Sequence, residues 1–267
     1  MSLEQQVANL VQASNNLTKA VNDKISEIDA KVNQATSAVP ATVKALFDQT
    51  LYVNETTGNS ANDGLSDAKP LKYLEDAIYK VPAGGKARIV VRTNIVKFHN
   101  KWEMNGKTKQ ELGITDGRTI YIDLAGNDLI INTSHYNSWG ADKLNPENPC
   151  LDKNFQVRAN SFLEIYNGNI RLSPLSGDEG KSLYSHTSMC SLFNNDSSRT
   201  QLSNMKIDST IASVGLFGLD NWGAMGFNAH MRDTTLTGVG LMKRVVNGAV
   251  ADDIIIKKIN VTSTWTE

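Results

Sequence analysis

Residues 3–39 contain neither glycine nor proline, and apolar residues recur through them at helical spacing. Successive apolar positions lie three or four residues apart, which is the pattern of a coiled-coil seam, with one extra four-residue step after Val21. Ser14 is the only polar member of this seam. We expect the oligomer contact to be made by Leu3, Val7, Leu10, Leu17, Val21, Ile25, Ile28 and Val32.

We expect this helix to begin at Ser2, which can form a capping box with Gln5, and to end at Pro40. Such a helix extends about 55 Å. This is long for a helix that covers a globular body, so the sequence favours a coiled coil. The valine, isoleucine and leucine of the seam favour two strands, whereas small or apolar flanking residues such as Val11 and Ala13 favour three.

Composition excludes several classes of protein. The 27 lysine and arginine residues balance 28 aspartate and glutamate residues, which argues against nucleic-acid binding and against a polybasic membrane arm. No apolar run reaches the roughly 18 residues of a membrane-inserted helix. Two cysteines, Cys150 and Cys190, are too few for a disulfide framework or a four-cysteine zinc site. The first residues do not read as a signal peptide, so we expect synthesis and folding in a cytoplasm.

After a short helical segment at 41–48, the sequence changes to a β pattern. Residues 51–53 read as a strand and 58–64 as a loop rich in turn-forming residues. Residues 70–81 read as a helix that begins at Pro70. Its apolar face is formed by Leu71, Leu74, Ala77 and Ile78.

A weak repeat follows: an apolar residue, four mostly polar or turn-forming residues, and a second apolar residue. Its copies lie at 90–95, 124–129, 165–170, 202–207, 231–236 and 256–261. Their third residues are Arg92, Gly126, Asn167, Asn204, Asp233 and Lys258. Four of these six tolerate the left-handed backbone of a tight corner. The repeat predicts a β-solenoid whose rungs stack about 4.8 Å apart, although alone it also permits a sandwich or a jelly roll.

Two segments resemble parts of a known family. Residues 3–43 (LEQQVANL to VPATV) resemble the amino-terminal stalk of tail fibre and tailspike proteins of tailed bacteriophages. Residues 52–78 (YVNETTGNSANDGLSDAKPLKYLEDAI) resemble the opening of the right-handed parallel β-helix of tailspikes, where a strand and a loop lead into a helix that covers the first rung. The resemblance implies a mainly β fold: a right-handed parallel β-helix with an N-terminal α-helical coiled coil, assembled as a parallel homotrimer.

The resemblance also implies a domain organisation and a function. It places a coiled-coil stalk for virion attachment at 1–40, a neck and capping helix at 41–82, and a β-helix body with loop insertions at 83–267. The expected protein is a tail fibre or short tailspike, made in the host cytoplasm and carried on the virion. It would bind baseplate or tail proteins through its N-terminus and contact host surface polysaccharide. Two alternatives are an adaptor that carries another tail fibre and a spike that depolymerises polysaccharide.

The sequence gives little support for an enzyme. Tailspikes that digest polysaccharide have a longer β-helix and a further C-terminal domain, whereas here the last repeat lies close to the end of the sequence. Glycosidases need two carboxylates at a defined separation, and no spacing singles out a pair among Glu164, Asp208, Asp220 and Asp233. The four histidines show no metal-ligand spacing. We therefore expect no catalytic residues, no metal and no cofactor, with polysaccharide cleavage as the open alternative.

Three tryptophans, Trp102, Trp139 and Trp222, are candidates for glycan binding. Each lies in loop-like sequence beside asparagine and near glycine. An exposed indole with neighbouring amides suits stacking on a sugar face. Alternatively, each packs over an edge of the body or against a neighbouring protomer. The inserts at 97–118 and 133–154 are where we expect a binding surface.

The last strand of a solenoid exposes an edge that can pair with another chain. The segment at 254–267 (IIIKKINVTSTWTE) carries Lys257, Lys258 and Trp265. We expect these residues either to shield that edge or to dock a partner, and the sequence does not decide between the two roles.

Overall fold

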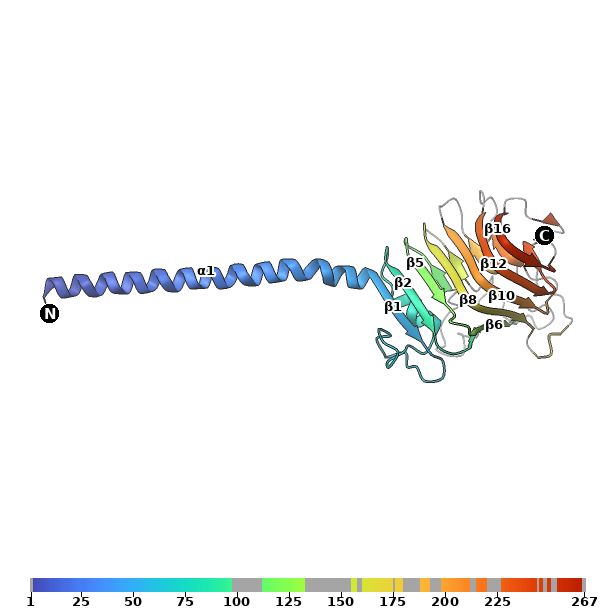
Figure 1. Ribbon diagram of the computed structural model, residues 1–267, viewed down its shortest axis with the longest axis horizontal. Coiled ribbons are helices and arrows are strands. Elements are labelled where there is room, and N and C mark those ends of the chain that lie inside the picture. Colours follow the sequence, from blue (N-terminus) through green and yellow to red (C-terminus); the bar gives the residue numbers. More distant parts are fainter. Residues whose placement is uncertain are drawn as a thin grey trace, which may run out of the picture. The chain divides into compact units, whose positions relative to one another are not determined.

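The structure is a computed structural model, and the described elements fall into two compact units, Met1–Leu46 and Phe47–Glu267. The first unit is helical and the second is a body of β strands with one short helix (Figure 1). The expectation of a mainly β protein with an N-terminal helix is confirmed. The structure describes residues 2–97, 112–132, 155–157, 160–174, 176–179, 188–192, 198–211, 215–219, 227–243, 245–246, 249–250 and 254–265.

The first unit consists of α1 (Leu3–Phe47), a single helix of 45 residues. Its first turn is capped as predicted, because the Gln5 N–H donates to Ser2 Oγ at 3.3 Å. The prediction that Pro40 ends this helix is wrong, since α1 continues without a break to Phe47 (Figure 1). A proline removes one backbone donor, and a helix can continue past it when the following residues favour helical geometry.

The body contains two parallel sheets. The longer sheet has the order β1 (Asp48–Val53), β2 (Lys86–Val91), β5 (Thr119–Asp123), β8 (Phe162–Ser173), β10 (Arg199–Ser209), β12 (Phe227–Gly238) and β16 (Ile254–Ser263). Two short strands extend it, β3 (Ile95–Lys97) and β6 (Asp128–Asn132). The shorter sheet has the order β13 (Leu241–Lys243), β11 (Gly215–Leu219), β9 (Ser188–Leu192), β7 (Phe155–Val157) and β4 (Leu112–Ile114). A separate antiparallel pair joins β14 (Val245–Val246) to β15 (Ala249–Val250).

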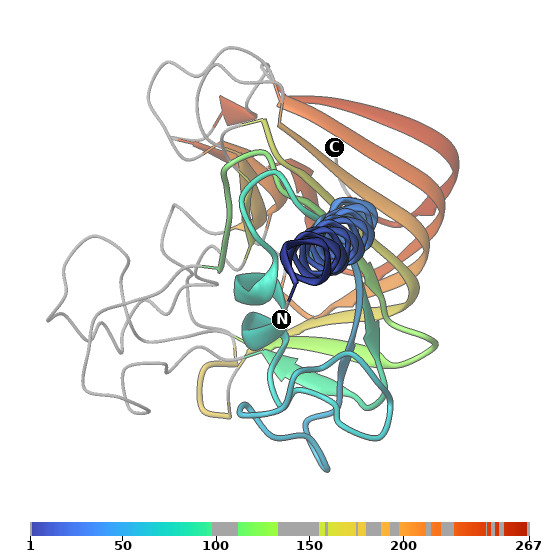
Figure 2. The ribbon, with the colours of Figure 1, turned by 90° about the vertical axis from the view of Figure 1, so that its left-hand side faces the viewer.

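The chain visits the two parallel sheets in turn. Each of β4, β7, β9 and β11 is followed directly in the sequence by a strand of the longer sheet. Successive strands of the longer sheet are also neighbours in space, and Figure 2 shows them as arcs that lie one behind another. β2, β5 and β8 are direct neighbours in this sheet, and the short strands that come from the intervals between them, β3 and β6, pair with each other and, through β6, with β8. The longer sheet is open, with β1 and β16 at its two edges.

Buried apolar side chains form columns across the longer sheet. A first column runs through paired positions of seven strands: Leu51, Ile89, Ile122, Ile165, Leu202, Met231 and Lys258. Its six apolar members are fully buried. A second column consists of Ile95, Leu129, Ile170, Ile207 and Leu236, which are also buried. The second column confirms the predicted final apolar position of the first five repeat copies.

The predicted register is wrong at the first positions of two early copies and throughout the last copy. In the first column Ile89 stands in place of Val90, and Ile122 in place of Leu124. Met231 of β12 pairs with Lys258 of β16 rather than with Ile256. The left-handed residue of β16 is Asn260, with φ of 52°, and not Lys258. Because β16 begins with three isoleucines, an apolar pattern fits it in more than one register, and the position of the bend selects one.

The segment after β1 covers the first edge of the longer sheet. The Leu71 N–H donates to the Tyr52 carbonyl at 2.8 Å, and the Asn54 N–H donates to the Leu71 carbonyl at 2.9 Å. Helix α2 (Leu74–Lys80) follows, so it begins four residues later than the predicted start at Pro70. The pairing of Leu71 with β1 keeps this segment extended, which explains the later start. The predicted apolar face is confirmed, since Leu71, Leu74, Ala77 and Ile78 are all buried.

Candidate functional site

Four neighbouring strands of the longer sheet bend at the same level. Each carries one non-glycine residue in the left-handed region, with φ of 58° at Asn167, 50° at Asn204, 49° at Asp233 and 52° at Asn260. Asparagine and aspartate tolerate this conformation better than other side chains that have a Cβ. The first three confirm the corners predicted from the repeat. Between β5 and β6, Ala125 and Gly126 have the same sign of φ.

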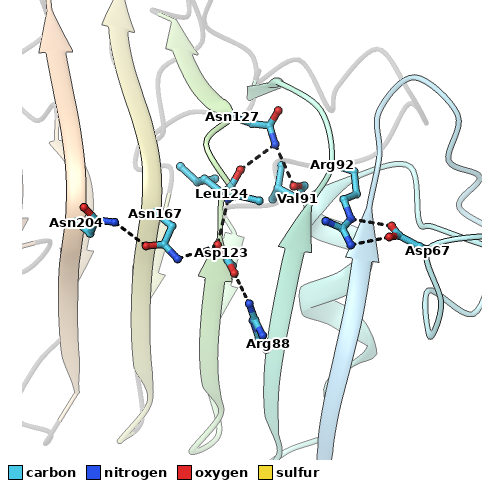
Figure 3. Close-up of polar contacts among 10 residues, drawn as sticks. Asp67, Arg88, Val91, Arg92, Asp123, Leu124, Asn127, Asn167 and Asn204 are labelled. Atoms are coloured by element: carbon cyan, nitrogen blue, oxygen red, sulfur yellow. Dashed lines mark hydrogen bonds and ion pairs between the residues drawn. The ribbon is translucent and has the colours of Figure 1, made fainter.

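The corner side chains are linked by hydrogen bonds in two groups, one on β5, β8 and β10 and one on β12 and β16. Asn204 Nδ2 donates to Asn167 Oδ1 at 2.8 Å, and Asn167 Nδ2 donates to Asp123 Oδ1 at 3.3 Å (Figure 3). On the next two strands, Asn260 Nδ2 donates to Asp233 Oδ1 at 2.9 Å. The stacking of equivalent positions therefore produces a polar ladder, which we define as Asp123, Asn167, Asn204, Asp233 and Asn260.

Asp123 anchors the ladder at its buried end. Its side chain is only 5% exposed, and it accepts hydrogen bonds from Arg88 Nη2 at 2.5 Å and from the Ala125 N–H at 3.1 Å (Figure 3). The Arg88 side chain is 54% exposed, and its hydrogen bond to Asp123 raises the pKa of the guanidinium. Burial raises the pKa of Tyr166, and the charge of Asp123 adds to that effect. The ladder therefore rests on a buried carboxylate that a solvent-facing cation neutralises.

Two further residues shape the bend. Asn127 Nδ2 donates to the Leu124 carbonyl at 2.9 Å and to the Val91 carbonyl at 3.1 Å, which joins the turn after β5 to β2 (Figure 3). Gly168 lies against Leu124 so closely that an added Cβ would come within 2.4 Å of the Leu124 Cβ. A glycine is thus required where β8 passes this turn.

An open groove with a volume of about 490 Å³ follows the ladder along the outside of the bend. Its lining consists of Gly126, Asn167, Gly168, Asn169, Asn204, Met205, Lys206, Asp233 and Thr235. Side-chain amides, one ammonium group, one carboxylate and one hydroxyl can donate to and accept from a hydroxyl-rich ligand. The groove therefore offers many directional hydrogen bonds.

The amide of Asn169 is held in place beside the groove. Its Nδ2 donates to Asp128 Oδ1 at 2.8 Å, and Asp128 Oδ2 accepts from Arg171 Nε at 2.8 Å. The Asp128 N–H in turn donates to Asn94 Oδ1 at 3.0 Å. These contacts extend the polar surface from the corners onto β6 and the turn before β3, and they fix the rotamer of one lining residue.

Sequence reasoning missed the residues that line the groove beyond the corners. Asn169, Lys206 and Thr235 each lie two positions after a corner residue, at paired positions of β8, β10 and β12. The recurrence of a polar side chain at this place in the repeat was the signal that could have identified them. Asn260 was missed because the last copy was placed in the wrong register.

The residues predicted from the sequence fall into two groups. Trp102, Trp139 and Trp222 lie outside the described residues, as do Asp220 and most of the two inserts. The remaining candidate carboxylates are each bound to an amide or a hydroxyl. Glu164 Oε1 accepts from Gln201 at 3.1 Å and Asp208 Oδ1 from Thr237 at 2.7 Å. Asp233 is a ladder residue.

The seam of α1 is a second candidate surface. Its eight predicted contact residues are between 48% and 76% exposed: Leu3, Val7, Leu10, Leu17, Val21, Ile25, Ile28 and Val32. The apolar face continues past Pro40 through Val43 and Phe47, which are exposed as well. Lys24 and Lys31 both bind Glu27, at 2.5 and 2.7 Å, on the polar side of the helix. Hydrogen bonds to the two lysines lower the pKa of Glu27.

Within the described residues, no group of three or more histidine, cysteine, aspartate and glutamate side chains is placed to hold a metal ion. Neither described helix has an apolar stretch of the length needed to cross a membrane. Comparison with known protein families, with curated proteins and with solved structures finds no match to this chain.

Proposed function

We propose that the chain is a structural protein of a phage virion, a trimeric tail fibre or short tailspike. The observation that carries this proposal is the exposed seam of α1. A regular stripe of leucine, valine and isoleucine along a 45-residue helix needs further helices to bury it. Val11, which flanks the seam, is also 54% exposed, and a stripe of this width suits three parallel helices. The proposal agrees with the resemblance of residues 3–43 to fibre stalks.

In this proposal the body is a right-handed parallel β-helix. Support comes from the alternation of the chain between two parallel sheets, the neighbouring placement of successive strands and the shared bend. Parallel strands joined by crossovers are right-handed in nearly all proteins. A solenoid of this kind is a stiff support whose side surface repeats the same positions on every rung.

The groove beside the polar ladder would contact host surface polysaccharide. Its amides and its single hydroxyl match the donors and acceptors of sugar hydroxyls. Its described lining holds one carboxylate, Asp233, whereas glycosidases use two. We therefore propose binding rather than cleavage at this groove. The N-terminal helix would attach the protein to baseplate or tail proteins.

The oligomer tests the proposal first. Light scattering on the purified full chain is expected to give the mass of three copies at all protein concentrations. A mass of one or two copies would refute the trimer. Deleting residues 3–39 is expected to abolish incorporation into particles while the body keeps its β circular dichroism, and retained incorporation would refute the attachment role.

Binding is tested separately on the groove. The exposed Thr235 lines the groove, and Thr235→Trp is expected to block it and to lower retention on immobilised host surface polysaccharide at least tenfold. Thr50→Trp places the same side chain at an exposed position of β1, which is far from the lining residues in the sheet order, and should leave retention unchanged. Equal retention of both variants would refute sugar binding at this groove. New reducing ends released from the polysaccharide would favour the depolymerase instead.

A further inference from the structure

A row of paired residues crosses the outer face of the longer sheet. Gln201 of β10 pairs with Glu164 of β8 on one side and with His230 of β12 on the other. His230 pairs in turn with Lys257 of β16. Each of these residues directly precedes a member of the first column, so its side chain points away from the core. The row is distinct from the lining of the groove beside the polar ladder.

Two cations lie near His230 on this face. Arg199 is two positions before Gln201 and therefore on the same face of β10, and Lys257 is the direct partner of His230 on β16. Arg199 and Lys257 are exposed, whereas His230 is half-buried. Burial lowers the pKa of His230, and the positive charges of Arg199 and Lys257 lower it further. We call Arg199, His230 and Lys257 the basic patch.

Carboxylates are scarce around the basic patch. Ahead of the bend, the outward-facing positions that the structure describes on β10, β12 and β16 hold no aspartate or glutamate. The row reaches a carboxylate at Glu164 on β8, whose Oε1 accepts from Gln201 Nε2 at 3.1 Å. Arg232 adds a cation next to the bend, with Asp233 Oδ2 at 3.6 Å from its Nε. The patch therefore has a local excess of positive charge, although the chain as a whole is balanced.

Two aromatic rings continue this surface from the patch towards β5. The Arg199 guanidinium lies over the Phe162 ring, 4.8 Å from its centroid. The Phe162 and Tyr121 rings meet edge to face with their centroids 5.5 Å apart, and Lys86 Nζ lies 5.5 Å from the centroid of Tyr121. Both rings are half-buried. They hold Arg199 against the sheet and place apolar surface directly beside the cations.

The C-terminal segment divides its two expected roles between its residues. Trp265 is buried, with 6% exposure, and its Nε1–H donates to the Thr237 carbonyl at 2.7 Å. For Trp265 the structure thus favours shielding. Lys257 instead faces outward and is exposed, which favours contact with a partner.

We propose that the basic patch, with Phe162 and Tyr121 beside it, binds a carboxylate-bearing polysaccharide. Arg199 and Lys257 come from strands that lie about 10 Å apart, so they can hold acidic groups of a chain that crosses the strands. The rings offer apolar surface on which sugars can pack between these charges. Nucleic acid is the less favoured polyanion, because the chain as a whole has no excess of positive charge.

The choice of a polysaccharide as the ligand rests on the proposed contact with the host surface. β10 and β12 carry residues of the patch ahead of the bend and lining residues of the groove beyond it, so one polysaccharide can contact both. In that case the groove binds sugar hydroxyls and the patch selects for acidic sugars.

The test measures retention of the full chain on immobilised polygalacturonate, in which every sugar bears a carboxylate, and on uncharged dextran. The wild type is expected to bind polygalacturonate more tightly than dextran, and to bind it less as salt is added. Lys257→Gln is expected to weaken this retention about fivefold, and Lys257→Arg to preserve it. Lys69→Gln is the matched control, because it removes the same charge from an exposed position in the loop after β1, and it should change nothing.

A folded Lys257→Gln variant, judged by circular dichroism, that keeps wild-type retention on polygalacturonate would overturn the proposal. An equal loss in Lys69→Gln, or equal retention of the wild type on dextran, would overturn it too. Tighter binding of single-stranded DNA than of polygalacturonate would assign the patch to nucleic acid instead. The fibre is judged from mass and incorporation into particles. A protein that binds polygalacturonate through Lys257 but has the mass of one chain would therefore refute the fibre and keep the site.

Discussion

The helix and the body place the same kinds of side chain in opposite environments. Isoleucine, leucine and valine recur along both, yet Ile25 and Ile28 of α1 are 51% and 57% exposed, whereas Ile122 and Ile165 of the body are fully buried. A single helix cannot bury its own stripe, while a chain that stacks successive strands supplies partners for each apolar position. The body therefore buries its own core, whereas the stripe of the helix is exposed in a single copy, and we propose that other copies bury it.

The largest effect is expected from a charged residue in the seam of α1. Ile28→Asp places a carboxylate where other helices are expected to pack, and we expect the assembly to dissociate into single chains. An isolated helix is only marginally stable in water, so most of the helical circular dichroism should be lost as well. Light scattering and far-ultraviolet circular dichroism measure both effects.

Ala30→Asp is the control for this prediction, because residue 30 lies on the side of α1 away from the seam and is exposed. It should change neither mass nor helicity. If Ile28→Asp keeps the wild-type mass, the exposed stripe does not hold the copies together.

The same chemical deletion should have different effects in the two regions. Ile165→Ala removes buried atoms from the first column and is expected to destabilise the body by about 2 to 5 kcal/mol. Ile28→Ala removes the same atoms from the seam and should lower the stability of the assembly without changing the unfolding of the body. Denaturant unfolding of the β signal distinguishes the two, and equal effects on it would contradict the comparison.

Polar contacts of the body should also differ in their contribution to stability according to how deeply they are buried. Asp123→Ala would leave Asn167 and the Ala125 N–H without their buried acceptor, and we expect a loss of about 1 to 3 kcal/mol. Asp67→Ala breaks a second arginine–aspartate pair, with Arg92, in which the two side chains are 39% and 56% exposed. That exposed pair should contribute less than about 1 kcal/mol. Thermal unfolding of the two variants at neutral pH makes the comparison, and equal losses would refute the anchoring role of Asp123.

The corners show how far the sequence could predict the fold. Asn167, Asn204 and Asp233 were identified because a left-handed backbone conformation restricts which side chains can occupy a position. This restriction can be recognised within the sequence of a single strand. Asn260 was missed because the isoleucines of β16 satisfy an apolar pattern in two registers. Its register depends on where β12 bends, which is a property of the stack and not of the segment.

The contacts that anchor the polar ladder were harder to predict for a related reason. Arg88, Asp123 and Asn167 are bound to one another although they come from β2, β5 and β8, so no local spacing connects them. Their proximity depends on the lengths of the intervening loops, which vary from one repeat copy to the next. The seam of α1 involves only neighbouring turns of one helix, and its pattern was accordingly clear in the sequence.

The smallest expected effect concerns a charge on the polar side of α1. Two lysines lower the pKa of Glu27 from its ordinary value of 4.5, so the ionised carboxylate stabilises the helix. This contribution is complete above the unfolded pKa and is lost as the pH falls through the lower, folded pKa. Helical circular dichroism of the full chain between about pH 7 and pH 3 should therefore decline less in Glu27→Gln than in the wild type. Because Glu27 is exposed, the difference in helicity between the two proteins should be small and should shrink with added salt. It should be smaller than the effect of Asp123→Ala on the body. An equal decline in both proteins would show that the Lys24 and Lys31 contacts do not support α1.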